Sequence, residues 1–153
     1  MTLSCIPESI CSWDYRIEGA TAGYAAVSFN FMSEEGTVSL GSTEYSVCKE
    51  GMFQGRWTLN LHGRQVAEAI KQSAFFRSFE VQINGIDLTA EAESPLVRSF
   101  GILDGGRTVG SIRPVHPFTR RAEIECSSAV PELAQLFCFW LTALCWRRQH
   151  KSS

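Results

Sequence analysis

The sequence lacks the features that would indicate a nucleic-acid-binding or a secreted protein. Its 153 residues carry 14 basic and 16 acidic side chains, so no basic excess is present to attract nucleic acid. The opening residues, M-T-L-S-C-I-P-E-S-I-C, show no basic segment followed by a long apolar run, which argues against a secretory signal peptide. The expected location is the cytoplasm, either free or peripheral to a membrane, and no nucleic-acid partner is expected.

Metal-binding and disulfide patterns are missing as well. None of the six cysteines forms a C-x-x-C pair, and the three histidines do not cluster with them. These residues are Cys5, Cys11, Cys48, Cys126, Cys138, Cys145, His62, His116 and His150. Such scattered positions predict reduced thiols and neither a disulfide framework nor a structural metal. No cofactor is expected.

One long apolar stretch is present near the C-terminal end, P-E-L-A-Q-L-F-C-F-W-L-T-A-L-C-W-R-R at residues 131–148. Only two polar residues interrupt it between positions 133 and 146, so a helix here would be apolar on every side and must be buried in protein or lipid. Residues 133–146 would span about 21 Å as a helix, whereas the hydrocarbon core of a bilayer is roughly 30 Å thick. The length favours a helix buried in protein over residues 131–148. A tail anchor that inserts residues 133–146 into a membrane is the alternative.

Short alternating segments separated by turns precede this stretch. Ten to twelve segments between residues 13 and 126 alternate hydrophobic with polar side chains, as half-buried strands do. His62-Gly63 and Asn84-Gly85 are typical of two-residue hairpin turns. Residues 65–71 suit either a helix or a strand, and the hairpin turn before them favours a strand. Regularly spaced strands without intervening helices predict an antiparallel sandwich or barrel.

A closed barrel around the apolar helix satisfies both patterns. The predicted fold class is all-β with one buried helix, a closed antiparallel barrel of about twelve strands around the C-terminal helix. A barrel of about 11 strands is wide enough for a central helix, and strands of six or seven residues rise roughly 20–23 Å, which matches the helix length. Residues 1–12 are expected to be a flexible lead-in, and residues 13–150 one domain with its central helix at about 131–148. Because the helix fills the interior, no internal substrate cavity is expected and the protein is predicted to be non-enzymatic.

Three stretches together resemble the tubby C-terminal-like superfamily, which includes phospholipid scramblases and LURP-one-related proteins. They are R-S-F-G-I-L-D-G-G-R-T-V-G-S-I at residues 98–112, P-F-T-R-R at 117–121 and L-F-C-F-W-L-T-A-L-C-W-R-R at 136–148. The resemblance implies a twelve-stranded barrel threaded by the last helix, with phosphoinositide binding or membrane tethering as its activity. The acidic calcium-binding segment of scramblases is reduced here to Glu123 and Glu125, so calcium dependence is not expected.

The best positive cluster predicts an anion or lipid head-group site, because arginine forks match phosphate oxygens. Its members are Arg107, Arg113, His116, Arg120 and Arg121. The alternative is a solvated strand edge that blocks aggregation, which is what charge runs more often form. The predicted function is therefore a lipid head-group (phosphoinositide-like) or protein binding module, with an anionic lipid, a membrane surface or a protein as partner.

An enzyme is the weakest alternative. Glu91 with Glu93 and Glu123 with Glu125 are spaced so that each pair faces one side of a strand, but no histidine or nucleophile lies beside them in sequence. Cys48 and Cys126 could act as nucleophiles with His62 or His116, but the sequence does not place them together, and buried, inert cysteine is the ordinary state of such residues.

Overall fold

The computed structural model describes residues 1–51, 55–74 and 76–152, which form twelve β-strands followed by one α-helix. The strands are β1 (Thr2–Pro7), β2 (Tyr15–Glu18), β3 (Ala25–Phe29), β4 (Gly36–Leu40), β5 (Thr43–Glu50), β6 (Arg56–Leu61), β7 (Arg64–Lys71), β8 (Ser78–Ile83), β9 (Ile86–Ala92), β10 (Phe100–Asp104), β11 (Arg107–Pro114) and β12 (Ala122–Cys126). The helix is α1 (Glu132–Ser152).

The sheet is a closed antiparallel barrel in which each strand pairs with its neighbour in sequence. Closure is made by β1 and β12, where Leu3 lies opposite Ile124 and Cys5 opposite Ala122. Alternate residues point inward, as the period of a strand requires, so Ile124 is buried while Glu123 is exposed. The predicted fold class, a barrel of about twelve strands with one helix, is confirmed.

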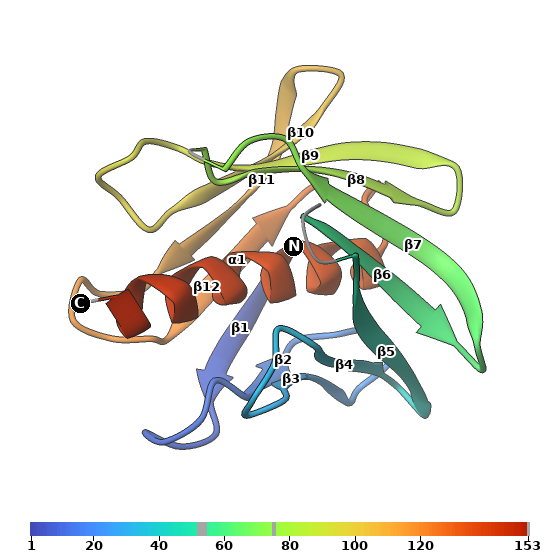
Figure 1. Cartoon of the computed structure of the whole chain (residues 1–153), viewed down its shortest axis with the longest axis horizontal. Coiled ribbons are helices and arrows are strands. Elements are labelled where there is room, and N and C mark those ends of the chain that lie inside the picture. Colours follow the sequence, from blue (N-terminus) through green and yellow to red (C-terminus); the bar gives the residue numbers. More distant parts are fainter. Residues whose placement is uncertain (52–54, 75, 153) are drawn as a thin grey trace.

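The helix runs through the middle of the barrel (Figure 1), and every residue from Ala134 to Arg147 is buried. Its two internal polar side chains each donate to a backbone oxygen, although the side-chain oxygen of Gln135 is buried without a partner among the described residues. The Gln135 amide donates to the Val130 carbonyl at 2.9 Å, and the Thr142 hydroxyl donates to the Cys138 carbonyl at 2.8 Å. The prediction that protein covers residues 133–146 therefore fits the structure. Within the described ranges, no helix combines the length and apolarity needed to cross a membrane.

One predicted boundary is wrong. Residues 1–12 are not a loose lead-in, because Thr2–Pro7 is the strand β1, hydrogen-bonded on both sides to β12 and β2. One other limit shifts by a few residues: α1 continues to Ser152, beyond the predicted residue 148. The ambiguous residues 65–71 belong to β7, as the hairpin before them suggested.

The two ends of the barrel differ in how the chain reverses. At the short-turn end the chain turns at residues 19–24, 41–42, 62–63, 84–85 and 105–106, and α1 begins there. Asn84 and Gly85 have φ angles of 50° and 77°, the left-handed geometry of a tight hairpin. The long-loop end contains loops 8–14, 30–35, 93–99 and 115–121, the described parts of loops 51–55 and 72–77, and the last turns of α1. Figure 1 shows the C terminus of α1 at the left among these loops.

Candidate anion-binding site

Four arginines at the long-loop end make the same kind of contact, in which the guanidinium group donates to backbone carbonyls of another loop. We call this set, Arg77, Arg98, Arg120 and Arg147, the loop-end arginines. In the part of the chain that the structure describes, none of the four forms an ion pair with a carboxylate. Their formal charges are therefore stabilised by carbonyl dipoles but not neutralised.

Three of these contacts run from one loop to the next around the rim. Arg77 in loop 72–77 donates to the carbonyls of Ser94 and Val97 at 2.8 and 2.7 Å. The contacts position loop 93–99, which supplies the next arginine.

Arg98 continues the series from loop 93–99. It donates to the carbonyls of His116, Pro117 and Thr119 at 3.2, 2.8 and 3.0 Å, which fixes loop 115–121. The same guanidinium lies 5.8 Å from the centre of the Trp146 ring, a favourable cation–π geometry.

Arg120 in loop 115–121 then contacts loop 8–14. Its two terminal nitrogens donate to the carbonyls of Ser9 and Ser12, each at 2.5 Å. Its guanidinium lies 4.8 Å from the centre of the Trp13 ring. Arg120 therefore joins two loops more than one hundred residues apart in sequence.

The fourth loop-end arginine comes from the helix. Arg147 is only 4% exposed and donates to the carbonyls of Asn30, Phe31 and Ser33 at 3.0, 3.2 and 2.9 Å. A buried cation without a counter-ion is costly to desolvate, so its positive charge favours any anion that approaches. Arg147 is thus a strong source of positive potential at this end.

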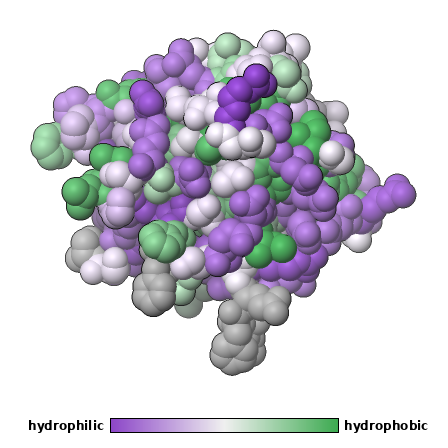
Figure 2. Space-filling view, turned by 90° about the horizontal axis from the view of Figure 1, so that it is seen from above, coloured by the Kyte–Doolittle hydropathy of each residue, from purple (hydrophilic) through white to green (hydrophobic). Residues whose placement is uncertain are grey.

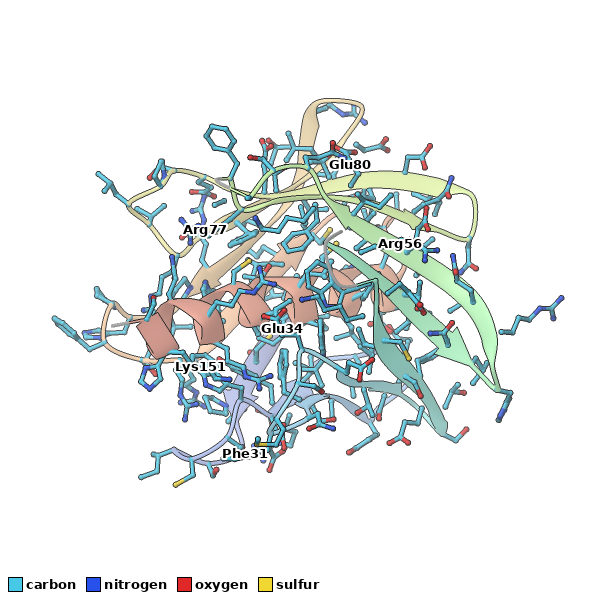
Figure 3. The ribbon with its side chains drawn as sticks, in the orientation of Figure 1. Phe31, Glu34, Arg56, Arg77, Glu80 and Lys151 are labelled. Carbon is cyan, nitrogen blue, oxygen red and sulfur yellow. The ribbon has the colours of Figure 1, made fainter. Side chains whose placement is uncertain are left out.

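A cleft of about 400 Å³ lies between loop 8–14, loop 30–35 and the end of α1. Its wall combines apolar side chains with cations, and includes Ile10, Trp13, Phe29, Phe31, Arg120, Arg147, His150 and Lys151. Among the described lining residues one is acidic, Asp14, and its carboxylate accepts a hydrogen bond from the Phe29 amide at 2.9 Å. Figure 3 places Phe31 and Lys151 on the side where α1 ends.

A second carboxylate at this end is already neutralised. Glu34 accepts hydrogen bonds from Arg148 at 2.5 and 2.6 Å and from Lys49 at 2.8 Å. The Arg148 bonds are the main reason that the pKa of Glu34 falls to about 2. Glu34 is thus fully charged at neutral pH and paired with two cations, so it does not compensate the loop-end arginines.

The structure separates the five predicted site residues. Arg107 begins β11 at the short-turn end, about 20 Å along the strand from Arg113, at a rise of roughly 3.3 Å per residue. Arg113 faces outward and pairs with Glu93 at 3.0 Å. His116 and Arg121 are exposed in loop 115–121, and the His116 ring accepts a hydrogen bond from a backbone amide of its own loop. Of the five, Arg120 lines the cleft.

Sequence reasoning missed most of the cleft. Of the lining residues, Arg120 belongs to the predicted site, whereas Trp13 and Arg147 do not. Lys151 lies three residues beyond the predicted end of the helix, and it lines the same cleft as Trp13. A pattern search would not find this set, because its members come from positions 10–14, 29–31, 120 and 147–151.

The groups considered as nucleophiles are not activated. Burial is the main cause that raises the pKa of Cys126 and of Cys48, and it raises the pKa of Cys138 to about 12. These thiols are protonated at neutral pH. Glu123 and Glu125 point to solvent on β12, where no nucleophile is paired with them among the described residues. Within the same ranges, no group of three or more His, Cys, Asp or Glu side chains is placed to hold a metal ion.

No protein-family model matches the chain, and no curated protein or solved structure does so either.

Proposed function

We propose that this protein is a non-enzymatic binding module for anionic lipid head groups, and that the cleft at the long-loop end holds the head group. One observation carries the proposal: four arginines surround one end of the barrel, and none of them is paired with a carboxylate in the described residues. Phosphate groups are the ligands that guanidinium and ammonium groups prefer.

The donors available to a phosphate support the same ligand class. Arg120 uses two of its five N–H groups in the two hydrogen bonds to loop 8–14, which leaves three. Lys151 lines the cleft, is exposed and makes neither a hydrogen bond nor an ion pair in the described part of the chain, so all three ammonium donors are available. Arg147 contributes charge from beneath the cleft. The resemblance to the tubby C-terminal-like superfamily points to the same ligand.

The direct test is calorimetric titration with inositol trisphosphate, a soluble phosphoinositide head group. Lys151→Gln removes a charge without breaking a contact of the fold, and we expect it to weaken binding about tenfold, the loss of one charge-assisted hydrogen bond. Arg107→Gln is the matched control, because this exposed arginine lies at the opposite end of the barrel and should bind within about twofold of wild type. Equal weakening by both variants, or no binding by the wild-type protein, would refute the proposal.

A further inference from the structure

The exposed hydrophobic side chains of this protein are concentrated at one end of the barrel. Of the eleven large hydrophobic residues that are exposed in the described chain, eight lie on the long loops. These are Ile10, Phe31, Met32, Phe76, Leu96, Val97, Val115 and Phe118, which we call the loop-tip hydrophobics. Figure 2 shows hydrophobic side chains protruding at its left edge, the side on which α1 ends in Figure 1.

These side chains do not belong to the core. Leu96 is 95% exposed, Phe118 is 93% exposed and Ile10 is 93% exposed, so they contribute little to folding. Apolar side chains that gather on one face of a protein mark a surface that another apolar phase covers. The eight residues are distributed over five loops, 8–14, 30–35, 72–77, 93–99 and 115–121. They therefore form separate projections around the end of the barrel.

The same end carries the unpaired positive charge described above. The loop-end arginines, Arg121 and Lys151 lie among the loop-tip hydrophobics. Projecting apolar side chains interspersed with cations match the chemistry of an anionic bilayer surface, where the apolar groups enter the interface and the cations meet phosphates. A protein partner would instead need to match several separate projections with complementary pockets.

We infer that the long-loop end docks on an anionic lipid bilayer, with the loop-tip hydrophobics in the interfacial region and the axis of α1 directed toward the membrane. This inference rests on the proposed function, because the head group bound in the cleft belongs to a lipid of that bilayer. It adds that the tips outside the cleft, such as Leu96 and Phe118, contribute to affinity for the membrane and contribute nothing to affinity for a soluble head group.

The test is flotation with phosphatidylcholine vesicles that contain phosphatidylinositol bisphosphate, compared with pure phosphatidylcholine vesicles. Leu96→Ser and Phe118→Ser each replace a side chain outside the core, and we expect each to lower the vesicle partition coefficient about tenfold. Tyr24→Ser is the matched control, since Tyr24 is 60% exposed in the turn at the opposite end. The vesicle partition coefficient of Tyr24→Ser should stay within about twofold of the wild-type value.

A second measurement reports orientation. The chain has four tryptophans of its own, so the emission added by each new tryptophan is taken as the difference from the wild-type protein. The emission added by Phe118→Trp should be quenched by brominated phospholipids, whereas that added by Tyr24→Trp should remain unquenched. Quenching of both tryptophans, or of neither in vesicles that bind the protein, would overturn end-on docking.

The outcomes separate the two proposals. If Leu96→Ser and Phe118→Ser lose vesicle binding but bind inositol trisphosphate like wild type, both proposals are supported. If these variants float like wild type, docking through the tips is overturned while head-group binding stands. Equal flotation of the wild-type protein on pure phosphatidylcholine overturns the requirement for an anionic bilayer. If the wild-type protein binds neither inositol trisphosphate nor any vesicle, the proposed function fails and docking fails with it.

Discussion

The short-turn end and the long-loop end of the barrel belong to one sheet but are held by different forces. At the short-turn end, hairpins such as Asn84-Gly85 reverse the chain within two residues through local backbone geometry. At the long-loop end, loops such as 115–121 are fixed by arginines that reach carbonyls far away in sequence. The comparison shows that local backbone geometry specifies the short-turn end, whereas contacts across the fold specify the long-loop end. The exposed apolar and cationic groups gather at the long-loop end.

The largest expected effect comes from breaking the long-range contacts. Arg147→Met removes three hydrogen bonds to loop 30–35 and leaves their carbonyls without a donor, so we expect a loss of about 3 kcal/mol in the free energy of unfolding. Urea denaturation measures it. Arg121→Met is the control, because its side chain is exposed and its stability should change by less than about 0.5 kcal/mol. Similar losses in both variants would show that the contacts of Arg147 do not hold the loop.

A smaller loss of stability is expected from removing the charge of Glu34, which pairs with Arg148 and Lys49. Measuring stability at two pH values isolates the contribution of this charge. Because the folded pKa of Glu34, about 2, lies below its usual value of 4.5, the carboxylate adds stability above the unfolded pKa. This contribution is lost as pH falls from about 4.5 through about 2. Glu34→Gln should destabilise the protein by roughly 2 kcal/mol at pH 7, after allowance for solvent screening. The difference in unfolding free energy between the two proteins should be smaller at pH 3 than at pH 7, because part of the contribution is already lost there. An equal difference at both pH values would contradict the role of the charge.

The short-turn end should respond least, and only to backbone changes. Gly85 has a φ of 77°, which a β-branched residue adopts with strain, so Gly85→Val should cost about 1–2 kcal/mol of unfolding free energy. Asn84→Gly keeps the turn geometry and should stay within about 0.5 kcal/mol of wild type. Thermal unfolding compares the pair. If Gly85→Val also altered binding of inositol trisphosphate, the independence of the two ends would be wrong.

Most of the fold follows from local patterns. The apolar helix, the hairpin turns and the alternation along β8 and β12 are all properties of neighbouring residues, which is why the barrel around a central helix is predictable. The strand β1 was missed because its partner β12 lies at the other end of the chain, and no turn connects them. Closure of the barrel depends on pairing between β1 and β12, so patterns among neighbouring residues do not predict it.

The candidate site was predictable only in part, for a chemical reason. The loop-end arginines bind backbone carbonyls, and every residue carries a carbonyl, so their targets have no signature in the sequence. Arg120 was included in the prediction because it lies in a basic run. Arg107 was included because it lies nearby in sequence, but it lies at the opposite end of the barrel, since residues a few positions apart on an extended strand are far apart in space.

The pairing of β1 with β12 has a consequence for synthesis of the protein on the ribosome. Leu3 emerges early, yet its partner Ile124 is made after eleven further strands have been started, and the filling helix comes later still. The inward faces of the early strands therefore stay uncovered during most of translation, when unpaired strand edges are prone to aggregate. Nascent chains of this barrel should depend on chaperones more than chains whose cores close early.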